Sequence, residues 1–266
     1  MNRGISQSGI CLYRFCPYAY KLKYIDKCIP MSYDSSAMDT GSYVHEAIKS
    51  YYWTKFSMDN TANDIFYDTY NKLRELWDIT LEPEWLKKAY DCLKTHAEWE
   101  YQNIKKGITK PFSEIKIDQN NIDKTNNGYF GILDYVNLQK AQVIDWKTGS
   151  YPTVSFEYRM QAHVYKILFE SKFDTKLKDF YFFYLYPNQW RKISYTNPKQ
   201  IEAGKECDYL LSKILDNGYE KKPRLENSCR YCDFKYYCKV IEEPYQIKNE
   251  IYKNIKEDSD VRKQYD

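Results

Sequence analysis

The chain has 266 residues, of which 43% are hydrophobic and 18% aromatic, and its formal net charge at pH 7 is +3. Disordered chains are poor in aromatic residues and carry a high net charge, so this composition excludes an intrinsically disordered protein. The mild positive charge permits a polyanionic partner without requiring one, and the lack of long apolar stretches argues against membrane contact.

The predicted elements run from helices at the N-terminus to alternating strands and helices. Four segments carry apolar and aromatic side chains at helical spacing: 8–24, 38–53, 63–77 and 83–104. Three strand-like segments follow, with a turn at 126–128: 112–118, 128–138 and 141–146. The order is completed by a helix, a strand that we expect to be buried, and a second helix: 156–169, 180–186 and 198–215. This alternation predicts an α/β fold.

Two of these strands each carry an aspartate at the end of an apolar run. Asp134 lies in the segment 131–136, and Asp145 lies in the segment 143–149, a short hairpin later. Successive side chains of a strand point to opposite faces, so Asp145 and Lys147 share a face. Two converging carboxylates suit Mg²⁺ or Mn²⁺, and a lysine beside them can offset charge on a phosphate. An acid-x-base triplet is common by chance, so an ordinary ion pair on the sheet remains the alternative.

Three cysteines near the C-terminus have the spacing of metal ligands. Cys229, Cys232 and Cys238 form the pattern C-x2-C-x5-C, which is more typical of a metal centre than of disulfides in a reducing compartment. A site with four sulfurs needs one more thiolate, and Cys16 is the leading candidate because the Cys16-Pro17 step is typical of iron–sulfur ligation. The other candidates are Cys11, Cys28, Cys92 and Cys207. Four thiolates also suit zinc.

Taken in order, these motifs resemble the PD-(D/E)XK nucleases of the RecB and AddB kind, including CRISPR-associated and phage RecB-like exonucleases. The resemblance covers nearly the whole chain. The matching motifs are Cys-Pro-x-x-Tyr at 16–20, Gly-x-x-x-His at 41–45, Gly-Ile-x-Asp at 131–134, Asp-x-Lys-Thr-Gly at 145–149, Gln-x-x-x-Tyr at 161–165 and the cysteine trio. Glu114 aligns loosely with an acid that the family carries on an earlier strand. The aspartate before x-Lys replaces a glutamate, which the family tolerates.

The resemblance implies a restriction-endonuclease-like core, in which a central mixed sheet is flanked by helices. It implies a catalytic Mg²⁺ or Mn²⁺ whose ligands are His45, Asp134, Asp145 and the backbone carbonyl of Trp146. Lys147 would be the catalytic lysine. Gln161 and Tyr165 share one helical face, which either contacts the active site or simply packs on the sheet. His96 and His163 belong to no motif and are expected to be ordinary residues.

The resemblance also implies a structural [4Fe-4S] cluster, with zinc as the alternative. Its ligands would be Cys16, Cys229, Cys232 and Cys238. We expect one integrated domain with three parts: a helical part at 1–110 that carries Cys16 and His45, the nuclease core at 111–216, and the cluster segment with a helical tail at 217–266. The densest basic segments, 221–224 and 105–110, are expected to be solvated surface.

The function that follows from the resemblance is a metal-dependent deoxyribonuclease. We expect an exonuclease or end-processing enzyme that acts on single-stranded DNA or on free ends, with protein partners in recombination, repair or a CRISPR pathway. One rival is a nucleic-acid-binding or assembly subunit that keeps the fold without chemistry, and a second is a zinc-bound structural module with an unrelated enzyme core. The N-terminus has no apolar signal core, so we expect a cytoplasmic protein, in a host cytoplasm if its origin is viral. The oligomeric state stays open.

Overall fold

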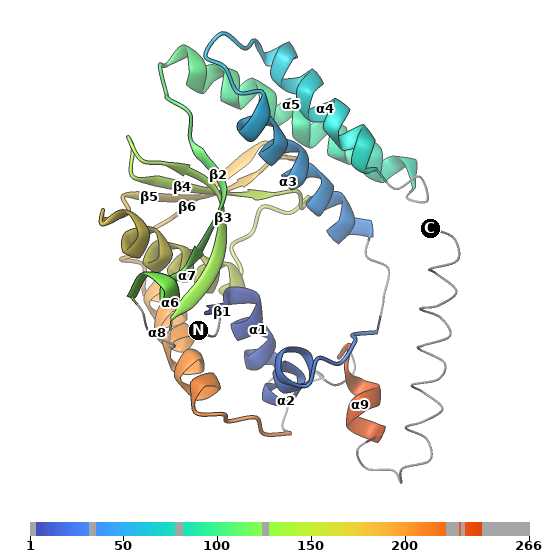
Figure 1. Ribbon diagram of the computed structural model, residues 1–266, viewed down its shortest axis with the longest axis vertical. Coiled ribbons are helices and arrows are strands. Elements are labelled where there is room, and N and C mark those ends of the chain that lie inside the picture. The colour runs from blue at the N-terminus through green and yellow to red at the C-terminus, as the bar shows by residue number, and fades with distance from the viewer. Residues whose placement is uncertain are drawn as a thin grey trace. The chain divides into compact units, whose positions relative to one another are not determined.

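Figure 1 shows the computed structural model, which describes residues 4–31, 36–77, 82–123, 128–221, 229 and 232–240. The chain divides into two units. The first contains Met1–Ile10 and Asp34–Asp216, and the second contains Cys11–Tyr33 and Asn217–Asp266. Three features expected from the sequence lie outside the described residues: the turn residues 126–127, the basic residues 222–224 and the tail beyond 244. The three-part division of the chain stays a prediction.

The first unit is built on a mixed sheet, which has six strands in the part of the chain that the structure describes. The strands are β1 (Ile5–Ser6), β2 (Phe112–Asp118), β3 (Tyr129–Asn137), β4 (Gln142–Lys147), β5 (Asp179–Tyr184) and β6 (Gln189–Ile193). Their order is β1-β3-β4-β5-β6, and β2 pairs with β3. The β1–β3 and β4–β5 pairs are parallel, and the other three pairs are antiparallel.

Helices cover both faces of this sheet (Figure 1), which confirms the predicted α/β fold with a central mixed sheet. The helices of the first unit are α3 (Ser36–Thr54), α4 (Ala62–Leu76), α5 (Pro83–Lys105), α6 (Gln119–Asp123), α7 (Phe156–Phe173) and α8 (Pro198–Leu215). Phe183 of β5 packs into the core formed with α3, α4 and α5. The adjacent Phe182 points to the opposite face, where its ring centroid lies 5.2 Å from that of Tyr158 in α7.

Local sequence signals fix where these helices begin and end. The Thr61 side chain accepts a hydrogen bond from the amide of Asp64, and the Asp64 carboxylate accepts one from the amide of Thr61, so a reciprocal capping box starts α4. Ser155 caps α7 by accepting from the amide of Tyr158. None of the described helices is both long and apolar enough to cross a bilayer.

The strand β6 is absent from the sequence prediction. Its residues are mostly polar and half-exposed, so they lack the apolar alternation on which the prediction relied. The hairpin that joins β5 to β6 contains Asn188 at a φ of 50°, a conformation that asparagine tolerates well. The Pro187-Asn188 pair was therefore the signal that could have located this hairpin.

The second unit carries its own apolar core. Its helical elements are α2 (Pro17–Tyr20), a π-helical turn (Lys21–Ile25) and α9 (Lys235–Val240), while α1 (Gln7–Phe15) runs from the first unit into the second. Pro17 stands at the start of α2, so the segment 8–24, expected as one helix, is divided into α1, α2 and the π-helical turn. The core contains Cys16, Ala19, Leu22, Cys232 and Phe234.

Helix α5 places two titratable groups in the core between α3 and the sheet. His96 and Glu100 are 0% and 1% exposed. The Tyr52 hydroxyl lies 3.1 Å from Nε2 of His96, and the amide of Asn103 donates to Glu100 over 3.3 Å. Burial raises the pKa of Glu100 to about 7 and lowers the pKa of His96 to about 3. Both groups therefore make stability depend on pH, in opposite directions.

Replacing Glu100 with glutamine is expected to remove one of these dependences. Because the folded pKa of about 7 exceeds the ordinary value of 4.5, the contribution of protonated Glu100 is full below pH 4.5 and is lost as the pH rises through 7. The difference between a pKa of 4.5 and one of about 7 corresponds to about 3 kcal/mol of stability. Urea unfolding at pH 4.5, 6 and 8 should therefore show the Glu100→Gln variant gaining about 3 kcal/mol on the wild type by pH 8.

The matched control is Glu98→Gln, which changes an exposed glutamate of the same helix. The stabilising contribution of neutral His96 is lost as the pH falls below 6.5, and this effect is the same in all three proteins. Parallel stability curves for the wild type and Glu100→Gln would contradict the burial of an ionised Glu100.

Candidate metal centre

The candidate metal centre lies where the strands β3 and β4 separate. These strands pair through Tyr135–Ile144, Val136–Val143 and Asn137–Gln142 and no further. Beyond that point the amide of Trp146 donates to the Asp134 carboxylate over 2.8 Å. A side chain has replaced the backbone acceptor of the neighbouring strand, so Asp134 both holds the two strands at the fork and turns its carboxylate into the opening.

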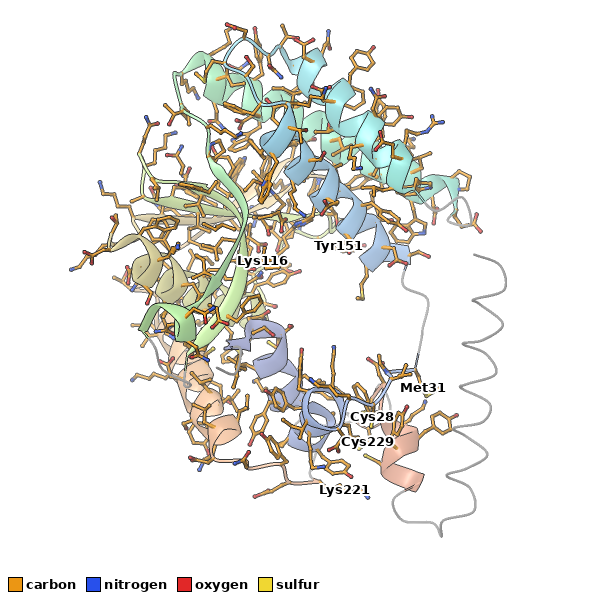
Figure 2. The ribbon with its side chains drawn as sticks, in the orientation of Figure 1. Cys28, Met31, Lys116, Tyr151, Lys221 and Cys229 are labelled. Carbon is orange, nitrogen blue, oxygen red and sulfur yellow. The ribbon has the colours of Figure 1, made fainter. Side chains whose placement is uncertain are left out.

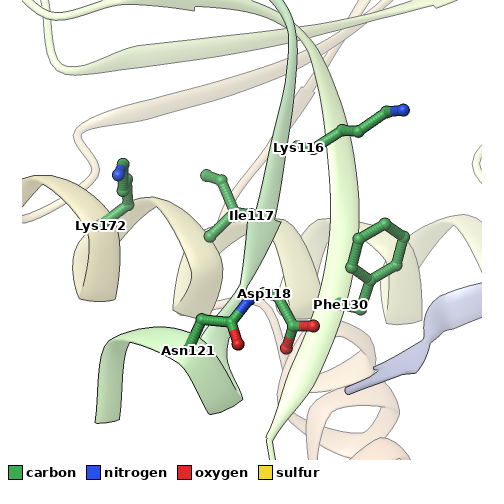
Figure 3. Close-up of a pocket in the computed structure, with 6 residues that line it drawn as sticks. All are labelled: Lys116, Ile117, Asp118, Asn121, Phe130 and Lys172. Carbon is green, nitrogen blue, oxygen red and sulfur yellow. The ribbon is translucent and has the colours of Figure 1, made fainter. Parts of the chain in front are cut away.

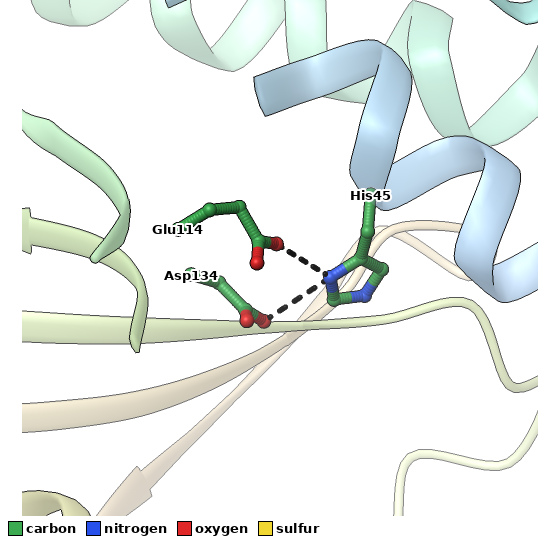
Figure 4. Close-up of side chains that lie close together, drawn as sticks. All are labelled: His45, Glu114 and Asp134. Atoms are coloured by element: carbon green, nitrogen blue, oxygen red, sulfur yellow. Dashed lines mark hydrogen bonds and ion pairs between the residues drawn. The ribbon is translucent and has the colours of Figure 1, made fainter. Parts of the chain in front are cut away.

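Three side chains from three elements meet at this fork, as Figure 4 shows: His45 of α3, Glu114 of β2 and Asp134 of β3. One ligand atom from each lies within 4.8 Å of the other two. Nδ1 of His45 is 3.2 Å from the nearer Glu114 oxygen and 3.6 Å from an Asp134 oxygen. Ligands on one octahedral Mg²⁺ lie about 3 to 4.2 Å apart, so the spacing of this group suits a shared divalent cation.

His45 is oriented through its second ring nitrogen. Nε2 lies 3.2 Å from the backbone carbonyl oxygen of Trp146 and donates to it, since a carbonyl can only accept. This bond leaves Nδ1, which faces both carboxylates, as the ring nitrogen that a metal ion could bind. Close packing holds the helix in place, because a Cβ at Gly41 would stand 3.3 Å from the Thr148 hydroxyl. The role of the Trp146 carbonyl as a metal ligand stays a prediction.

The electrostatics of this group favour a cation. Burial raises the pKa of Asp134 well above its ordinary range, and the neighbouring Asp145 and Glu114 raise it further. Burial lowers the pKa of His45, but Asp134 and Glu114 raise it more, to about 9. A divalent ion among these carboxylates would relieve their mutual repulsion and hold them ionised. The donor set of one imidazole and several carboxylate oxygens is also chemically suited to Mg²⁺ or Mn²⁺.

Asp145 is held beside this group by a different set of partners. Nζ of Lys147 lies 2.6 Å from one Asp145 oxygen, and the Gln161 amide donates to the other over 2.7 Å. Gln161 also accepts from Lys147 over 3.0 Å and donates to the Tyr165 hydroxyl over 3.1 Å. One turn of α7 thus joins Asp145, Lys147 and Tyr165 into a single hydrogen-bonded network, as the spacing of Gln161 and Tyr165 suggested.

Lys147 is positioned as a fixed positive charge. Burial lowers its pKa, but the ion pair with Asp145 raises it, and the net shift is upward. Its ammonium group also lies 4.5 Å from the ring centroid of Tyr158 and 5.2 Å from that of Phe182. The lysine therefore stays protonated at neutral pH, which suits it to stabilising negative charge rather than to accepting a proton.

All these side chains line one open cavity of about 560 Å³. Its polar lining residues include His45, Glu114, Asp134, Asp145, Lys147, Gln161 and Tyr165. The structure thereby brings together, in one cavity, the predicted residues of the first unit. Whether each performs its predicted role stays open, and Asp145 stands apart from the compact group of three.

The sequence prediction left Glu114 out of the ligand set, although the structure places it against His45. Glu114 lies within β2 at a φ of 52°, where a residue other than glycine is strained. The backbone twist directs its side chain toward the fork, opposite Asp134. An acid in the earlier strand was the only signal in the sequence, because a left-handed glutamate inside a strand has no sequence pattern.

The predicted cluster cysteines all lie in the second unit. Cys16 and Cys232 are buried in its core, Cys238 packs against them, and Cys229 is exposed. Figure 2 marks Cys229 together with Cys28, which also packs against this core. Burial raises the pKa of the Cys238 thiol to about 11, and the nearby Cys232, Cys16 and Cys229 contribute to this rise. Cys238 is thus within electrostatic range of the other three cysteines.

The comparisons with known proteins agree with the fold and the gathered ligands. No curated protein matches the chain. The family model of the PD-(D/E)XK nuclease superfamily matches residues 4–239, a span that includes both the carboxylate fork and the cysteine core. The chain therefore belongs to the PD-(D/E)XK nuclease superfamily.

Proposed function

We propose that the protein is a metal-dependent exonuclease or end-processing enzyme that hydrolyses phosphodiester bonds in DNA. The superfamily supports a metal-dependent nuclease and a nucleic-acid substrate. The observation that carries the proposal is the meeting of His45, Glu114 and Asp134 beside Lys147 in one open cavity. An inactive relative that only binds nucleic acid would have no need to keep a buried acid network around a charged lysine.

The residues of the cavity would divide the chemistry among them. His45, Glu114 and Asp134 would hold a Mg²⁺ or Mn²⁺ ion, which would supply Lewis acidity for attack of water on the phosphate. Asp145 would complete the oxygen donors on the side of β4. Lys147 would offset the negative charge that develops on the phosphate in the transition state. Gln161 would hold the side chains of Asp145 and Lys147 in position, because it forms a hydrogen bond with each of them.

The test is cleavage of end-labelled oligonucleotides with Mn²⁺, Mg²⁺ or a chelator. We expect stepwise products from single-stranded substrates in the presence of either metal and no products in chelator. Blocking the 5′ end and the 3′ end in separate substrates gives the polarity, and a circular single strand separates exonuclease from endonuclease action. A homogeneous preparation that cleaves none of these substrates with either metal would remove the proposed activity.

We also propose that the second unit holds a [4Fe-4S] cluster on Cys16, Cys229, Cys232 and Cys238. Two buried thiols and a third in the same apolar core support it, because such a core shields a cluster from water. One tetrahedral zinc would hold its sulfurs about 3.8 Å apart. Zinc on the same four thiolates stays the alternative, and metal analysis of the purified protein separates the two.

The subtype and the partners rest on the motifs alone. The order of the cysteine and carboxylate motifs supports a RecB-like enzyme of a phage or CRISPR-associated kind, which would act in the cytoplasm on DNA ends in recombination or repair. The test compares single-stranded and duplex substrates that have free ends. A nuclease of this kind must cleave at least one of them, so cleavage of neither would contradict the proposal.

A further inference from the structure

A second cavity adjoins the metal centre along the free edge of the sheet. Its volume is about 590 Å³, and Glu114 lines both cavities. One wall comes from α3 and the other from β2 and the residues before it. Its lining residues include Lys49, Trp53, Lys110, Phe112 and Lys116. We name this cavity the edge groove.

The charge of the edge groove is positive apart from its inner end at Glu114. Lys110 and Lys116 are exposed and make no ion pair with any residue that the structure describes. Lys49 pairs with Glu46 over 2.8 Å, so its charge is partly balanced. Lys116 also borders a smaller pocket with Lys172, but Figure 3 shows the two ammonium groups pointing away from each other. Lys116 lines the edge groove as well as this smaller pocket.

The two aromatic side chains of the groove are exposed yet held in place. Trp53 is 65% exposed, and its indole N–H donates to the backbone carbonyl of Ser113 over 3.1 Å. Phe112 is 47% exposed, and its ring centroid lies 5.7 Å from that of Phe173. Large exposed rings that are fixed by a partner lose little entropy when a ligand stacks on them, so they are suited to binding.

We propose that the edge groove binds an unpaired nucleic-acid strand that continues from the phosphate at the metal centre. Lysines at Lys110 and Lys116 would contact the backbone, and Trp53 and Phe112 would stack on bases. Lysine is depleted at protein–protein interfaces, so this lining argues against a protein partner. A duplex keeps its base faces covered by stacking, so only an unpaired strand can use both rings. The inference rests on the proposed nuclease function.

The charge contacts are tested by binding of a fluorescein-labelled oligothymidylate of 20 nucleotides in chelator, followed by anisotropy. The Lys110→Ala/Lys116→Ala double variant should bind about tenfold more weakly. The slope of log affinity against log salt should fall in magnitude by about 1.4, or about 0.7 for each lost phosphate contact. The control is Lys87→Ala/Lys94→Ala, which removes two exposed lysines of α5 and should match the wild type.

The stacking contact has a different signature. The Trp53→Ala variant should bind the same oligonucleotide about tenfold more weakly with an unchanged salt slope. Trp53→Phe, which keeps a ring without the N–H, should recover most of the affinity. Thermal unfolding of each variant shows whether the fold persists, which the exposure of Trp53 leads us to expect.

Two results would overturn the inference: groove variants that bind like the control, or equal losses for a duplex of the same length. Binding is measured without metal, so it does not depend on hydrolysis. A wild type that binds through the groove but cleaves nothing with Mn²⁺ would refute the nuclease and leave the groove standing. Cleavage by the wild type, together with groove variants that bind normally, would support the nuclease and refute the groove.

Discussion

Replacing Lys147 with methionine is expected to lower phosphodiester cleavage by about 1,000-fold and to leave Mn²⁺ binding in place. Methionine keeps the length and the apolar stem of the side chain but removes the ammonium group that faces Asp145. The group of His45, Glu114 and Asp134 does not include Lys147, so the ligands of the cation persist. Single-turnover cleavage with Mn²⁺ measures the rate, and titration calorimetry measures the metal.

Asp134→Asn should behave differently, because it removes a ligand. We expect this variant to lose both Mn²⁺ binding and cleavage, while the asparagine oxygen can still accept from the amide of Trp146. The contrast between the two variants separates binding of the ion from stabilisation of the transition state. Lys166→Met is the matched control, since Lys166 forms a similar ion pair with Glu170 on α7 but lies outside the cavity.

The variants also carry a structural cost that must be measured. Lys147→Met leaves Asp145 buried with Gln161 as its remaining partner, which destabilises the site. Thermal unfolding in Mn²⁺ therefore accompanies the kinetics, and a folded variant that binds Mn²⁺ has a formed centre. Full cleavage by Lys147→Met would show that the lysine takes no part in the reaction. Normal Mn²⁺ binding by Asp134→Asn would show that Asp134 is not a ligand of the cation.

The fork between β3 and β4 could be predicted because its residues follow strand periodicity. Asp134 and Asp145 each interrupt an apolar run, and the period of two places Lys147 on the face of Asp145. The turn spacing of α7 likewise placed Gln161 and Tyr165 together. Each of these patterns depends only on the spacing of residues within one strand or one helix. The structure places Asp145 with Lys147 and Gln161 with Tyr165 as those spacings predict.

Glu114 and the edge groove lay beyond such patterns. The left-handed φ of Glu114 is imposed by the fork and not by the glutamate itself, whose preference is for other conformations. Lys110 belonged to a basic segment that we expected to be plain surface. Its place beside Trp53 arises only when α3 packs against β2, two elements separated by about 60 residues of helical chain.

The cysteine core yields the second large effect. Replacing Cys232 with serine is expected to abolish cluster binding, so that protein purified without oxygen loses its brown colour and its broad visible absorption. Cys232 is buried in the apolar core of the second unit, which limits the access of water to the position of its thiolate. A cluster bound at this site would contribute to folding of the second unit, so the same variant should unfold at a lower temperature.

The fourth ligand is decided by two further variants, because Cys16 and Cys28 both pack in this core. Cys16→Ser should lose the cluster and Cys28→Ser should keep it, since Cys16 contributes to the raised pKa of both Cys232 and Cys238. Iron and zinc are quantified for each protein by emission spectroscopy. A colourless wild-type protein with one equivalent of zinc would show that the site holds zinc and not a cluster. A colourless Cys28→Ser variant beside a brown Cys16→Ser variant would show that Cys28, and not Cys16, is the fourth ligand.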